Sequence, residues 1–85
     1  MVWRVLVLLI WWGLALPTQA SDLCQAGPKD AWQSKTVLEH KLLAQGWRLR
    51  RITVEDGCYE VYGWDASGKP IEAYFHPRTL APVSR

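Results

Sequence analysis

The sequence lacks the patterns that mark most cofactor and metal sites. Its two cysteines form neither C-x-x-C nor the haem-attachment pattern C-x-x-C-H, and His40 and His76 lie at no recognised ligand spacing. None of its serines lies in a nucleophile-elbow motif. We therefore expect no cofactor, no metal ion and no enzymatic activity.

The chain also lacks an apolar run of about 20 residues, the length that a membrane-spanning helix needs. Its one long apolar stretch, residues 5–16, follows Arg4 and is followed by small residues at the positions that a signal peptidase reads before a cut after Ala20. We interpret residues 1–20 as a cleaved secretory signal peptide, which predicts a periplasmic or secreted protein with no stable membrane insertion. The alternative is an uncleaved anchor, which the two tryptophans inside the run disfavour.

An excess of charge of either sign is also missing. Without residues 1–20, which contain Arg4 as their one charged residue, nine basic and eight acidic side chains remain. Nucleic-acid binding needs a concentrated basic footprint, so this balance argues against it. The remaining 65 residues suffice for one domain with a marginal core, which we expect to be monomeric.

The two cysteines, Cys24 and Cys58, would meet an oxidising compartment after export. An even pair in a small secreted chain commonly forms a disulfide, and here it would close a loop of about 35 residues. Such a bridge contributes roughly 3–4 kcal/mol in the chain-entropy model. The sequence therefore predicts a structural disulfide.

One helix and three strands are predicted after an irregular arm at residues 21–33, which contains Gly27-Pro28. Capping residues at Ser34 or Thr36 and a terminal Gly46 delimit a helix over 35–45. Segments rich in β-branched and aromatic residues, separated by turn sequences, predict strands at 47–55, 58–65 and 69–76, and residues 80–83 could add a short edge strand.

The turns predict which strand residues pair. Asp56-Gly57 suits a two-residue type I′ hairpin, and Gly68 suits the left-handed position of a three-residue loop. The two predicted pairings assign the side chains to the two faces of the sheet in the same way. The face expected to pack on the helix collects Ile52, Val54, Tyr59, Val61, Ile71, Ala73 and Phe75. Trp47 and Leu49 join it only if a bulge near Arg50-Arg51 shifts the alternation. The fold class is α+β: one helix on a three- to four-stranded antiparallel meander.

Several short motifs resemble the PepSY domain, in particular the small secreted single-domain PepSY-like proteins of Gram-negative bacteria. They are Leu43-Ala44-Gln45-Gly46-Trp47, Gly57-Cys58-Tyr59-Glu60-Val61-Tyr62, Asp65-x-x-Gly68-Lys69 and Glu72-Ala73-Tyr74-Phe75-x-Pro77-x-Thr79, within residues 31–83. The domain would occupy residues 34–83. The sequence departs from the family pattern where Trp47 replaces Tyr, His76 replaces the Asp before Pro77, and Leu80 replaces the Gly after Thr79.

The resemblance implies a non-enzymatic binding role, because such domains occur in protease propeptides and are proposed to restrain peptidases. We expect an accessory module that modulates a peptidase or another envelope protein. The alternative is a cofactor-free subunit or modulator of an envelope redox complex, since such domains also recur beside cytochromes.

The second sheet face is the candidate binding surface, because aromatic and charged side chains alternate on it. Its members are Arg51, Glu60, Tyr62, Trp64, Glu72 and Tyr74. Glu60 and Glu72 are expected to be neighbours that form cross-strand ion pairs with Arg51. Alternatively, the disulfide lays the arm with Trp32 across this face, which then becomes a second small core.

Overall fold

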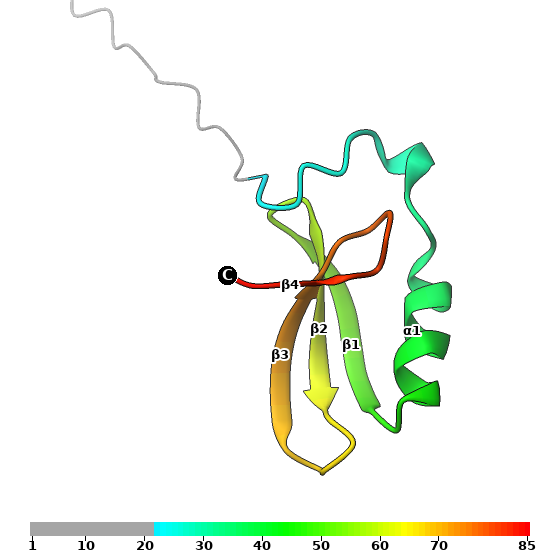
Figure 1. The fold of residues 1–85 in the computed structure, drawn as a ribbon, viewed down its shortest axis with the longest axis vertical. Coiled ribbons are helices and arrows are strands. Elements are labelled where there is room, and N and C mark those ends of the chain that lie inside the picture. Colours follow the sequence, from blue (N-terminus) through cyan, green and yellow to red (C-terminus); the bar gives the residue numbers. More distant parts are fainter. Residues whose placement is uncertain (1–21) are drawn as a thin grey trace, which may run out of the picture.

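The computed structural model describes residues 22–85, so the predicted signal peptide lies outside the described part of the chain. One helix packs against one face of a four-stranded antiparallel sheet (Figure 1). The elements are a short 3₁₀ turn η1 (Lys29–Ala31), helix α1 (Lys35–Ala44) and strands β1 (Arg48–Glu55), β2 (Cys58–Trp64), β3 (Pro70–Phe75) and β4 (Pro82–Val83). The α+β prediction is confirmed.

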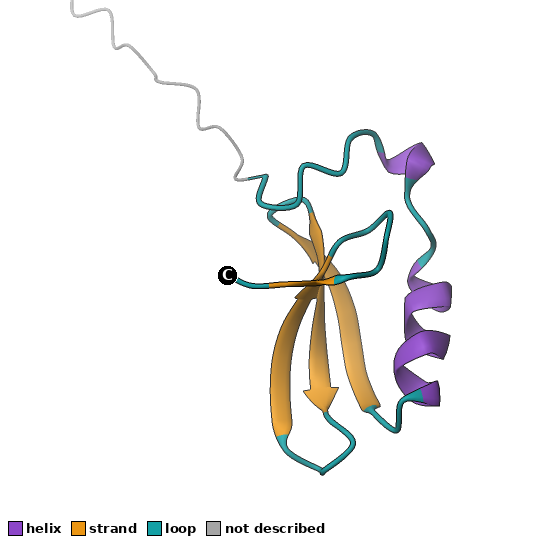
Figure 2. Ribbon diagram, viewed as in Figure 1, coloured by secondary structure: helices purple, strands orange, loops and turns teal. Residues whose placement is uncertain are grey.

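The strands lie in the order β1-β2-β3-β4, each paired with its neighbour in sequence (Figure 2). Val54 pairs with Tyr59 and Tyr59 with Phe75, as both predicted registers require. Asp56 and Gly57 have φ values of 53° and 72°, the left-handed pair that a type I′ turn needs. Two short turns therefore determine which side chains share each face of the sheet.

Helix α1 has the predicted ends. The Ser34 hydroxyl accepts a hydrogen bond from the Val37 backbone N–H at 3.3 Å. At the other end Gly46 has φ 89°, and its N–H and that of Trp47 donate to the carbonyls of Leu43 and Leu42. This is a Schellman ending, and it directs the chain back into β1.

The core lies between α1 and the sheet. Leu38 and Leu42 of the helix are fully buried against Tyr59, Val61 and Phe75. Val37 of the same helix lies outside this core and is 45 % exposed. Val54 is also exposed, although strand alternation places it on the same sheet face as the core residues.

A bulge shifts the register of β1 between Leu49 and Arg51, at the position where the sequence allowed for one. Trp47 and Leu49 consequently pack against the core, and the Trp47 ring meets Phe75 edge-on at 6.0 Å between centroids. The bulge presses backbone against Gly63 of β2, where an added Cβ would lie 2.2 Å from the Arg48 carbonyl oxygen. Gly63 is thus the residue that makes room for the bulge.

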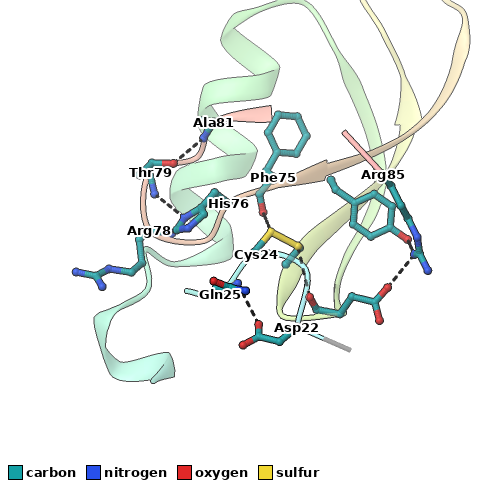
Figure 3. The surroundings of a disulfide bond; sticks show 12 residues. Asp22, Cys24, Gln25, Phe75, His76, Arg78, Thr79, Ala81 and Arg85 are labelled. Carbon is teal, nitrogen blue, oxygen red and sulfur yellow. Dashed lines mark hydrogen bonds and ion pairs between the residues drawn. A yellow bond between two sulfur atoms is a disulfide. The ribbon is translucent and has the colours of Figure 1, made fainter. Parts of the chain in front are cut away.

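Residues 22–34 run along the end of the sheet and return to the helix. The disulfide forms between Cys24 and Cys58, as predicted (Figure 3). The Tyr59 hydroxyl donates to the Gln33 carbonyl at 2.6 Å, and Gln33 in turn bonds to the loop after β3. Neither helix within residues 22–85 has the length and apolarity of a membrane crossing.

The turn after β3 forms although its residues His76 and Leu80 depart from the PepSY pattern. His76 Nδ1 accepts hydrogen bonds from the N–H groups of Arg78 and Thr79, at 3.1 and 3.4 Å, as a carboxylate would at this position (Figure 3). Leu80 adopts φ 63°, which favours glycine, but its side chain is buried in the core. Burial of the leucine compensates for the strained backbone.

Replacing Gly63 by alanine should destabilise the protein by roughly 1–3 kcal/mol, because the new methyl group meets backbone that cannot move aside easily. Gly68→Ala is the control: its φ is 86°, but nothing lies within 4 Å of the added Cβ, so it should cost only about 1 kcal/mol of backbone strain. Urea denaturation measures both. Equal losses would contradict the steric account of Gly63.

Reducing the disulfide should lower the free energy of unfolding by roughly 3–4 kcal/mol, since it frees a loop closed by residues 34 positions apart. The melting temperature of so small a domain should fall by well over 4 °C. Thermal unfolding with and without reductant measures the change. Two reactive thiols in denatured, unreduced exported protein would refute the bridge.

Candidate functional site

The open half of the outer sheet face carries stacked arginine–aromatic pairs. The guanidinium of Arg48 lies 5.0 Å from the centroid of the Trp64 ring, and that of Arg51 lies 4.5 Å from the Tyr62 ring. Both rings are half-buried and both arginines are exposed. Stacking holds these side chains in place while one side of each pair faces water.

The other half of the outer face is closed. Glu60 is 3 % exposed and Tyr74 is 8 % exposed, so neither offers a surface to a partner. Arg85 stacks over Tyr74, donates a hydrogen bond to its hydroxyl, and forms an ion pair with Asp56 at 2.9 Å. The structure therefore narrows the predicted face to Arg51, Tyr62, Trp64 and Glu72.

The C-terminus and the disulfide close this half, and Trp32 does not. Cys24, Cys58 and Tyr74 form a small cluster with Val83 of β4. Trp32 lies instead on the helix side, edge-on to Tyr59 at 5.5 Å. The alternative of an arm covering the whole face is wrong, although a second small core does exist at one end.

Glu60 and Glu72 are neighbours, as expected, but they interact with each other and with tyrosines. Burial alone would raise the pKa of Glu60, yet hydrogen bonds from Glu72, Tyr74 and Tyr62 and the charge of Arg85 outweigh it, so this pKa lies below its ordinary value. The hydrogen bond to Glu60, followed by desolvation and repulsion from its charge, raises the pKa of Glu72. Of these two carboxyl groups, the buried one, Glu60, therefore ionises more readily than Glu72.

The predicted ion pairs of Arg51 with these glutamates are absent from the described residues, where the one ion pair joins Arg85 to Asp56. Arg51 stacks on Tyr62 instead. Residues 22–85 also contain no group of three or more histidine, cysteine, aspartate or glutamate side chains that could hold a metal ion.

A shallow hollow of about 320 Å³ lies beside the open half of the face. Its lining combines aromatic, aliphatic and charged side chains: Arg50, Tyr62, Gly63, Trp64, Pro70, Ile71 and Glu72. The sequence did not indicate Arg50 as a residue of this surface, because the bulge in β1 brings it to the hollow. The surface suits contact with another protein, since aromatic residues and arginine dominate such contacts.

The fold is a small α+β module with arginines and aromatic residues exposed on one half of its outer sheet face. A family model described as "Peptidase propeptide and YPEB domain" matches residues 4–85, and the chain belongs to that PepSY family. Domains of this family are non-catalytic, propeptide- or inhibitor-type modules that typically bind peptidases. No curated protein and no solved structure matches the chain.

Replacing Glu72 by glutamine should stabilise the protein at pH 7. Its raised pKa means that the fold favours protonated Glu72, and this contribution is lost as the pH rises through the folded-state pKa. Glutamine removes the repulsion while keeping a donor for Glu60. The advantage should vanish well below pH 4, where both carboxyls are protonated.

Glu60→Gln should have the opposite effect at pH 7, because a lowered pKa contributes stability that is present at neutral pH and lost on acidification. Urea denaturation of both variants and of the wild-type protein, at pH 7 and well below pH 4, measures these changes in the free energy of unfolding. The same sign of change for both variants at pH 7 would contradict the assigned charge distribution.

Proposed function

We propose that this chain is an exported, non-enzymatic module that restrains a peptidase in the periplasm or outside the cell. The observation that carries the proposal is the open half of the outer face, where Tyr62 and Trp64 border a hollow on a scaffold of the PepSY family. Family membership supports the peptidase as the kind of partner.

The geometry supports binding through a few aromatic contacts. Tyr62 and Trp64 are already immobilised by their arginines, so their contact with a partner would cost little additional side-chain entropy. Arg50 and Glu72 at the rim supply both signs of charge. A partner would therefore cover the half of the sheet that the C-terminus leaves open.

The purified exported protein, added to an envelope extract of its source organism, should reduce hydrolysis of a fluorogenic casein substrate. Trp64→Ala should raise the concentration needed by about tenfold or more, as for an aromatic hot spot. Its loss of stability should remain near 0.2–1 kcal/mol, because Trp64 is half-buried on an open sheet face, where cross-strand contacts have this magnitude.

Tyr74→Ala is the matched control on the closed half, and it should cost roughly 3 kcal/mol because a buried ring is removed. Substrate hydrolysis that is unchanged by the wild-type protein would contradict the proposal. So would equal inhibition by wild-type protein and a folded Trp64→Ala variant.

A further inference from the structure

The outer edge of β1 is an unpaired strand. Within residues 22–85, β1 pairs with β2 on one side and with no strand on the other. Glu55 and Cys58 flank the two-residue turn, and in such a hairpin the flanking pair exchanges hydrogen bonds while the next pair does not. The N–H and C=O groups of Val54 and Ile52 therefore point outward, available to another strand.

A groove of about 400 Å³ runs between this edge and α1. From the helix it is lined by Lys35, Glu39 and Leu43, which are four residues apart and so share one side of α1. From the strand it is lined by Leu49, Arg50, Arg51 and Ile52. An edge strand beside a helix, with apolar side chains between them, is the arrangement that binds extended peptides by strand addition.

Charge selects the occupant. The groove lining contains three basic side chains, Lys35, Arg50 and Arg51. Its one acidic side chain is that of Glu39, so the groove carries a net positive charge. Leu43 at its rim is 47 % exposed and offers an apolar contact. A matching strand would present apolar side chains toward α1 and acidic ones toward Arg51, on its two alternating faces.

We propose that the outer edge of β1 binds an extended segment of a partner protein by strand addition, in the groove beside α1, and that acidic and apolar residues alternate along this segment. This binding mode rests on the proposed function, because both require that the chain acts by binding another protein. It assigns to that partner a second contact, which adjoins the aromatic hollow at Arg50.

Two other occupants match the groove less well. A second copy of β1 offers three arginines (Arg48, Arg50 and Arg51) against one acidic residue (Glu55), so it complements the positive groove poorly. Residues 1–20 of the chain contain no acidic side chain to meet these cations.

The test titrates the ¹⁵N-labelled exported protein with the peptide acetyl-Val-Glu-Val-Glu-Val-Glu-amide and follows its amide signals. The largest shifts should fall on Ile52, Val54 and Leu43. A peptide N-methylated at alternate residues, on the bonding edge, should bind about tenfold more weakly or not at all, which corresponds to about 1.4 kcal/mol or more. The Val-Lys analogue should not bind.

Two helix variants separate the groove from the rest of the surface. Leu43→Glu should abolish peptide binding, since it places an anion in the groove. Val37→Glu, at a similarly exposed position about 200° around the helix from Lys35, should leave binding unchanged. Neither side chain is buried, so both variants should fold.

Several outcomes would overturn the proposal: equal binding of the N-methylated or lysine peptide, equal effects of the two helix variants, shifts confined to Trp64 and Tyr62, or dimerisation through β1. Trp64→Ala should leave peptide binding intact. If the peptide fails to bind while Trp64-dependent inhibition of hydrolysis persists, strand addition is wrong and the proposed function stands. If the peptide binds but the protein does not inhibit hydrolysis, the proposed function is wrong and strand addition stands.

Discussion

The pairing of β2 with strands on both sides is the constraint on which the rest of the structure depends. β2 is buried along most of its length, and its alternate residues supply both layers of the molecule. Tyr59 and Val61 enter the core beneath α1. Cys58 and Glu60 are buried on the opposite face, where Cys58 forms the disulfide with Cys24. A slip of one residue would exchange these two sets and bury the wrong side chains.

The sequence could predict this register because its determinants are local. Asp56-Gly57 admits few conformations other than a tight turn, and Gly68 lies where the next loop needs a left-handed residue. The bulge in β1 could be located but not decided from the sequence, because strict alternation would place Trp47 and Leu49 on the outer face. The helix ends at Ser34 and Gly46 are equally local, which is why their positions agree with the structure.

What the sequence could not show depends on contacts between distant residues. Arg85 closes over Tyr74, and nothing near either residue indicates this. The burial of Glu60 follows from that closure, so the candidate surface was predicted too large. Leu80 shows a different obstacle: its backbone position favours glycine, and only the tertiary core explains why a leucine is stable there.

The outer face is therefore divided along its strands into a structural half and an open half. At the disulfide end, Cys24 and Arg85 exclude water, and Glu60 keeps its charge because tyrosine hydroxyls and a guanidinium replace the water. At the far end, Arg48 and Arg51 cover Trp64 and Tyr62 only partly. Residues 22–85 form one α-helix, α1, which covers one sheet face. The apolar surface of the other face is shielded by charged side chains instead, so Arg48 and Arg51 cover Trp64 and Tyr62 where no helix does.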